Sequence, residues 1–169
     1  MNRLVVRFLE IMPLFFFAFY SITHKKEPHV WIASFLIAGV CGAAVTFVLY
    51  RKKILLDRFY LSINLFFVIG AISLTFKFSS FLDLYGSGLE QIFFLILFIV
   101  GLSSTILTKA GFVGVKGPDK FIRTGSLVLL IIAGLGVTLS ILFPSDFAIG
   151  FAIPLIVFLA FRRIVLART

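Results

Sequence analysis

Residues 30–53 read VWIASFLIAGVCGAAVTFVLYRKK, an apolar run that carries no charge until it reaches Arg51, Lys52 and Lys53. About 20 mostly apolar residues are enough for a helix to cross the hydrocarbon core of a bilayer. Residues 30–50 meet that length, and basic residues directly after a span are typical of its cytoplasmic end. This stretch therefore predicts a membrane helix that ends inside the cell.

Similar apolar runs on both sides of this stretch predict an all-α membrane protein. The six expected spans are residues 4–23, 30–50, 59–78, 89–108, 125–143 and 147–164. The hydrophobic content of 61% and the mean hydropathy of +1.16 exceed those of soluble domains, which are roughly 45–50% apolar. In a chain of 169 residues, this composition predicts a single bundle of six transmembrane helices and leaves no room for a second domain.

The basic residues lie on alternate connections between these spans. Of the 16 lysines and arginines, only Lys25, Lys26 and Lys77 lie on the first, third or fifth connection. Because positive residues are retained in the cytoplasm, this alternation predicts that both termini are cytoplasmic. The net charge of +9 belongs to the same pattern, since lysine and arginine at span ends meet anionic lipid headgroups. We therefore expect membrane lipids as partners and no nucleic acid.

Small residues recur at every fourth position along residues 30–50 and share one helical face. They are Ser34, Ala38, Gly42 and Thr46. Helices in lipid associate where small side chains let their backbones approach closely. We therefore expect this small-residue stripe to form a helix–helix contact. Packing within one chain and packing between copies in a homo-oligomer both remain open.

Arg7, Glu10 and Pro13 interrupt the first expected span. An ionisable group inside a membrane helix is costly and marks a candidate functional site, so Glu10 is a candidate for proton coupling or for binding a polar headgroup. Alternatively, Arg7 and Glu10 pair across one turn near the interface, or residues 1–12 lie along the membrane surface as an amphipathic segment. Pro13 removes one backbone donor and is expected to kink or open the helix.

Four further polar or aromatic residues are candidates for functional roles. Asn64 is expected to form a hydrogen bond between helices, and Glu90 to lie at a helix N-terminus, where the helix dipole favours an anion. Gln91 lies beside Glu90 at the mouth of the fourth span. Tyr20 is expected to anchor the outer membrane interface. Each of these roles is structural, and a polar intramembrane site is the functional alternative.

Catalytic motifs are absent from the sequence, which contains no HExxH, GxSxG, phosphate-binding glycine loop or CxxC. His24 and His29 are too widely spaced and lack a nearby third ligand, so a solvated loop is favoured over a metal site. We therefore predict that the chain is not an enzyme and has no cofactor and no metal.

Two of the longer connections also carry expectations. Residues 79–88 include several apolar side chains that favour a short helix lying on the membrane surface. The connection between the fourth and fifth spans contains Gly111, Gly114 and Gly117 among its basic residues. This composition predicts an irregular cytoplasmic loop.

Residues 8–20, FLEIMPLFFFAFY, resemble the opening of the intracellular septation protein A (YciB-type) family of bacterial inner-membrane proteins. Members begin with a similar Phe-Leu-acidic-x-x-Pro-Leu run, which is followed by an aromatic stretch that ends in Tyr. Glu10, Pro13 and Tyr20 match this motif. The polar segment at residues 23–28 is longer than the family pattern, and the fourth connection lacks the family's Pro- and Trp-containing segment.

This resemblance implies a non-enzymatic protein of the bacterial inner membrane. Such a protein supports cell-envelope integrity or septation through contacts with lipids and with other membrane or cell-division proteins, and the family supplies no catalytic residues. The alternative from the residues themselves is a small transporter, channel or lipid-handling protein with a polar intramembrane site near Glu10. Its two three-span halves would then be inverted in the membrane.

Overall fold

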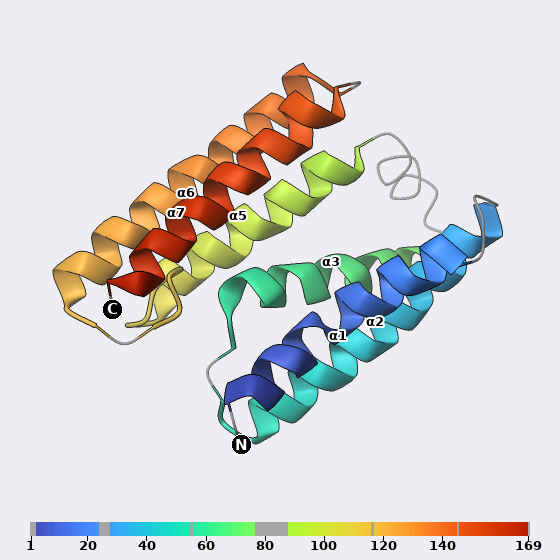
Figure 1. The fold of residues 1–169 in the computed structure, drawn as a ribbon, viewed down its shortest axis with the longest axis horizontal. Helices are drawn as coiled ribbons and strands as arrows, with labels where there is room; N and C mark the ends of the chain where they lie inside the picture. The colour runs from blue at the N-terminus through green and yellow to red at the C-terminus, as the bar shows by residue number, and fades with distance from the viewer. Residues whose placement is uncertain are drawn as a thin grey trace. The chain divides into compact units, whose positions relative to one another are not determined.

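The computed structural model describes residues 3–23, 28–54, 56–76, 88–115, 117–144 and 146–168. Within these ranges it is helical (Figure 1), which confirms the all-α prediction. The elements are α1 (Arg3–Thr23), α2 (Pro28–Arg51), α3 (Arg58–Thr75), α5 (Leu89–Leu107), α6 (Asp119–Leu142), the π-helical turn η1 (Ala148–Ala152) and α7 (Ile153–Ala167).

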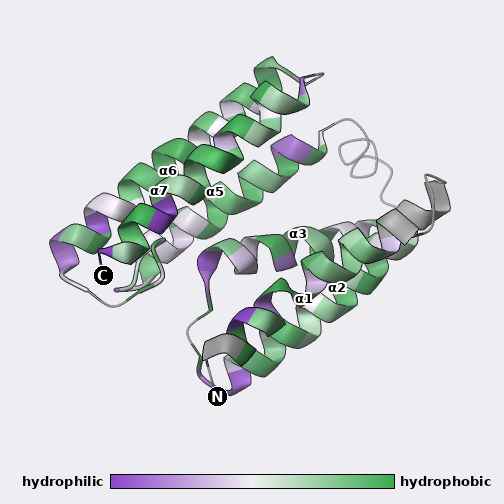
Figure 2. Cartoon of the chain, in the orientation of Figure 1, coloured by the Kyte–Doolittle hydropathy of each residue, from purple (hydrophilic) through white to green (hydrophobic). Residues whose placement is uncertain are grey.

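Five helical segments are long and apolar enough to cross a membrane (Figure 2). They are Ile32–Arg51, Arg58–Thr75, Leu89–Leu107, Asp119–Leu142 and Ala148–Ala167. Their lengths match the thickness of a bilayer core, which supports a membrane protein. α1 is not among the five, and it contains Arg7 and Glu10. The sixth span and the cytoplasmic position of both termini therefore stay predictions.

The chain divides into two compact units, Met1–Asp83 and Leu84–Thr169. In the first unit, α2 packs against both α1 and α3. In the second unit, α6 packs against α5, η1 and α7, and the Phe151 ring of η1 also lies 5.6 Å from the Phe93 ring of α5. Each unit thus contains three membrane-length or near-membrane-length helical segments, of which the middle one contacts the other two. The expectation that all six spans form one bundle stays a prediction.

The small-residue stripe of α2 packs against α3 inside the first unit. Ser34 and Ala38 are fully buried, and a Cβ added at Gly42 would lie 3.4 Å from the Cα of Asn64. The approach is closest at Gly39, beside the stripe, where an added Cβ would lie 2.8 Å from the carbonyl oxygen of Phe67. The small-residue stripe therefore packs within one chain, which is one of the two alternatives that the sequence left open.

Three phenylalanine rings join the helices of the first unit. Phe17 of α1 lies 5.1 Å from Phe35 of α2 and 4.9 Å from Phe67 of α3, between ring centroids. Phe35 and Phe67 are 5.7 Å apart, with their planes near the edge-to-face arrangement that aromatic pairs prefer. Each helix of the unit thus contributes one ring to a shared core.

The connection between α5 and α6 folds back onto the helices of the second unit. Phe112 and Val113 are each 3% exposed. The Phe112 ring lies 5.5 Å from Phe158 of α7, and a Cβ on Gly101 of α5 would overlap it. The prediction of an irregular cytoplasmic loop is thus incomplete, because glycine content indicated irregular backbone but not that these apolar residues are part of the core.

The start of α7 explains the position of Pro154. Proline has no N–H to bond the carbonyl four residues earlier, and its ring crowds that carbonyl. The chain forms the wider turn of η1 just before α7, and Pro154 occupies the first turn of α7.

The turn after α6 is tight, and Asp146 Oδ1 accepts hydrogen bonds from the N–H groups of Ala148 and Ile149 at 2.9 and 3.1 Å. α6 and α7 therefore form a helical hairpin within the second unit.

Candidate functional site

Glu10 of α1 is buried and bonds to the start of α3. Its side chain is 4% exposed, and its Oε1 accepts a hydrogen bond from the backbone N–H of Asp57 at 3.0 Å. Asp57 is the N-cap of α3, and its own carboxylate accepts from the N–H of Phe59 at 3.0 Å. Two carboxylates therefore satisfy donors at a helix N-terminus, where unpaired N–H groups and the helix dipole favour negative charge. This bond fastens α1 to α3.

The other candidates on α1 have different surroundings. The side chain of Arg7 is exposed, Pro13 is fully buried and Tyr20 is half-buried. α1 continues through Pro13 from Arg3 to Thr23, so the proline does not end the helix. Glu10 is tied by a side-chain hydrogen bond to the start of α3.

Asn64 forms the interhelical hydrogen bond that its position in a span predicts. It is 2% exposed, and its Nδ2 donates to Thr46 Oγ1 of α2 at 3.1 Å. Its Oδ1 is buried and has no hydrogen-bond partner among the described residues. Asn64 and Thr46 also line a cavity of about 360 Å³, most of whose other lining residues, such as Phe47 and Leu56, are apolar.

Gln91 and Glu90 lie in the first turns of α5, at the opposite end from the α5–α6 connection. Glu90 follows the N-cap Gly88, which confirms its expected place at a helix N-terminus. The Nε2 of Gln91 donates to the backbone carbonyl of Ser140 at 3.1 Å. Carbonyls in the last turn of a helix have no partner within that helix, and α6 ends at Leu142. Gln91 therefore satisfies the end of α6.

Glu10 and Gln91 perform equivalent tasks in their two units. Each lies on the first helix of its unit and bonds a backbone group at the end of another helix. In a low-dielectric environment an unpaired backbone group costs several kcal/mol, so both bonds stabilise the helix ends. Three of the predicted polar residues, Glu10, Gln91 and Asn64, thus bond to a second helix.

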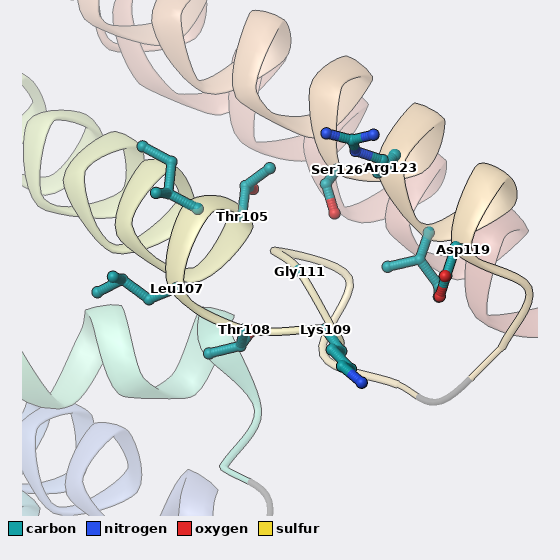
Figure 3. A pocket seen from close by; sticks show the side chains of 10 residues that line it. Thr105, Leu107, Thr108, Lys109, Gly111, Asp119, Arg123 and Ser126 are labelled. Carbon is teal, nitrogen blue, oxygen red and sulfur yellow. The ribbon is translucent and has the colours of Figure 1, made fainter.

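The second unit has a polar cavity of about 350 Å³ between the C-terminal end of α5 and the N-terminal end of α6 (Figure 3). Its lining residues are Thr105, Ile106, Leu107, Thr108, Lys109, Gly111, Asp119, Ile122, Arg123 and Ser126. Lys109 and Arg123 supply two positive charges and Asp119 one negative charge. In the sequence these basic residues indicate topology, and their clustering beside an apolar span is the one signal that points to the cavity.

Ser126 organises this end of the unit and was missed from the sequence. It is fully buried, and its Oγ accepts a hydrogen bond from the N–H of Phe112 at 2.9 Å and a weaker one from the N–H of Val113 at 3.5 Å. Gly111 precedes them with φ of 57°, a conformation that glycine adopts without strain. Nothing in the sequence distinguishes Ser126 from the other hydroxyl residues of the spans.

Metal-binding chemistry finds no support in the described part of the chain, where no group of three or more His, Cys, Asp or Glu residues comes together. His24, the side chain of His29 and residues 79–87 of the expected surface helix lie outside the described residues.

Comparison with known proteins identifies no relative: no family model, curated protein or solved structure matches the chain. The resemblance of residues 8–20 to the septation family therefore stays a prediction.

Proposed function

We propose that the chain is a non-enzymatic protein of the bacterial inner membrane that supports cell-envelope integrity or septation through contacts with lipids and with other membrane or cell-division proteins. The observation that carries this proposal is the hydrogen bond from the Asp57 N–H to Glu10. A coupling carboxylate must exchange protons with water, whereas Glu10 is 4% exposed and holds a helix end. Gln91 and Asn64 also bond to other helices, which favours a scaffold over a transport site.

The proposed protein has six spans, with α1 as the first and both termini in the cytoplasm. Support comes from the alternation of basic residues along the chain. Single cysteines test it in a Cys41→Ser background, because Cys41 is the only cysteine. We expect cysteines replacing Lys53 and Arg163 to react with an impermeant maleimide only after the inner face is opened. Cysteines replacing His24 and Pro144 should react from outside, and a His24→Cys variant that reacts only from inside would show that α1 does not cross.

A second candidate is a transporter or lipid-handling protein. The observation that favours it is the buried Oδ1 of Asn64, which has no hydrogen-bond partner among the described residues and belongs to a residue that lines a cavity of about 360 Å³. A polar atom beside an apolar cavity suits a ligand with one donor group. Flux through reconstituted vesicles separates this candidate from the scaffold.

Substituting Glu10 is the direct test of these two functions. Glu10→Gln retains an oxygen that accepts from the Asp57 N–H, so we expect nearly unchanged stability and unchanged crosslinking to partners. Glu10→Leu leaves that N–H unpaired and should lower the free energy of unfolding by about 2 kcal/mol. Unfolding in mixed micelles and crosslinking in membranes measure these effects. A solute flux that Glu10→Gln abolishes in a stable, folded protein would replace the scaffold by a proton-coupled transporter.

A further inference from the structure

The polar cavity of the second unit presents two basic side chains that are free to bind an anion. Lys109 follows α5 and Arg123 lies on α6, and both are exposed. In the view of Figure 3 they lie on either side of the turn at Gly111. Across the ranges that the structure describes, neither cation forms an ion pair or a side-chain hydrogen bond. With Asp119 also on the wall, the cavity has an excess of one positive charge.

The two threonine hydroxyls of the cavity are acceptors rather than donors toward a ligand. Thr105 Oγ1 donates its proton to the carbonyl of Gly101, and Thr108 Oγ1 donates to the carbonyl of Ser104, both at 2.8 Å. Each hydroxyl therefore presents only lone pairs to a ligand. Together with the Asp119 carboxylate, they suit a ligand that carries hydroxyl donors next to its anionic group.

The edge of the cavity is apolar. Ile106 and Leu107 are 72% and 79% exposed, and both line the cavity. The next turns of α6 carry two further exposed apolar residues, Leu127 and Ile131, which are 55% and 62% exposed. A small soluble anion has no use for such an edge, whereas the acyl chains of a lipid do. The cavity thus has the two-part chemistry of a phospholipid, with charge at the helix ends and apolar surface along the span.

The wall of the cavity is held in place before any ligand arrives. The N–H of Phe112 bonds to the buried Oγ of Ser126, and the Phe112 ring is 3% exposed. A Cβ at Gly111 would overlap Ser126 Oγ, so glycine lets the turn lie directly against α6. A preorganised site binds with less loss of conformational entropy than a flexible loop.

We propose that this cavity binds the headgroup of an anionic phospholipid whose headgroup carries hydroxyls, of which phosphatidylglycerol is the simplest bacterial example. Lys109 and Arg123 attract the anionic phosphodiester from the two sides of the turn at Gly111, and Thr105, Thr108 and Asp119 accept hydrogen bonds from the headgroup hydroxyls. Ile106 and Leu107 contact the acyl chains. The inference rests on the membrane location in the proposed function and names one class of its lipid partners.

Native mass spectrometry of the full-length protein, released from nanodiscs of phosphatidylcholine with added phosphatidylglycerol, tests the site. We expect preferential retention of phosphatidylglycerol and a roughly thirtyfold loss of its affinity in the Lys109→Gln/Arg123→Gln variant, because each of the two basic residues near an anionic headgroup contributes about 1 kcal/mol in general. The matched control is Lys120→Gln/Arg163→Gln, which removes the same charge from exposed positions of the same unit outside the cavity. An equal loss of phosphatidylglycerol affinity in both variants would show that the lipid is held by general charge attraction. That result would overturn the proposed site.

Two further arms test the chemistry of the headgroup. Phosphatidylethanol is a phosphodiester of the same charge without headgroup hydroxyls, so it should bind more weakly than phosphatidylglycerol, and Thr108→Val should weaken only phosphatidylglycerol. Equal binding of the two lipids would overturn the hydroxyl recognition. Inorganic phosphate at millimolar concentration should not displace the lipid, and displacement would identify a soluble-phosphate site instead. Specific lipid binding without any envelope partner would leave the site standing while the proposed function fails.

Discussion

Replacing Phe112 by alanine should lower the free energy of unfolding of the second unit by about 3–5 kcal/mol, the range for removing a buried phenylalanine side chain. The ring is 3% exposed and lies 5.5 Å from the ring of Phe158, which is fully buried. Its removal leaves a cavity between the α5–α6 connection and the helices. Unfolding in mixed micelles, followed by circular dichroism, measures the change.

Leu107→Ala is the matched control for this prediction. Leu107 is also apolar, lies in the same part of the chain and is 79% exposed. Its truncation removes no core contact, so we expect a change within about 0.5 kcal/mol. A Phe112→Ala variant no less stable than Leu107→Ala would contradict the folded-back connection and the preorganised cavity wall that depends on it.

Gly39→Ala should destabilise the first unit by about 2–3 kcal/mol, although alanine is the better helix former. The added Cβ would lie 2.6 Å from the Cβ of Ala71 and 2.8 Å from the carbonyl oxygen of Phe67. A backbone oxygen cannot rotate away as a side chain can, so α2 and α3 must separate. Thermal unfolding of the full-length protein measures the effect.

Two other glycines provide controls for Gly39. At Gly42 the nearest atoms to an added Cβ lie 3.4 Å away, on Asn64, and at Gly134 they lie 3.6 Å away, on Phe98. These are ordinary van der Waals distances, so we expect Gly42→Ala to cost little and Gly134→Ala to be neutral or slightly stabilising. Similar losses of stability in all three variants would show that the effect comes from the loss of glycine at a helix position. They would contradict the close approach of α2 and α3 as its cause.

The positions of the helices follow closely from the sequence because hydropathy is a local property. The expected span at 89–108 became α5, Leu89–Leu107, and the span at 30–50 became α2, Pro28–Arg51. The largest difference is at α6, which begins at Asp119 rather than 125. Hydropathy detects the part of a helix that suits lipid, whereas the first turns of α6 contain Asp119, Lys120 and Arg123 and extend the helix beyond that part.

The sequence predicts which residues need a hydrogen bond, but it does not predict which residue each of them bonds to. An asparagine in an apolar span needs a hydrogen bond, and Asn64 has one, but the sequence alone does not name Thr46. Glu10 was a candidate because a buried carboxylate is costly. Its partner is the N–H of Asp57, which lies 47 residues away. No pattern around either residue indicates that separation.

An all-α chain with apolar segments of membrane-spanning length follows from the amino-acid order alone, because local composition decides which helices suit lipid. The roles of Glu10 and Gln91 at helix ends, the burial of Phe112, and the shared cavity of Lys109, Asp119 and Arg123 emerge only in the folded protein. Each of these contacts joins residues on different elements. Their meeting depends on how the helices pack, and packing in lipid is governed by close approach at positions such as Gly39 rather than by hydropathy.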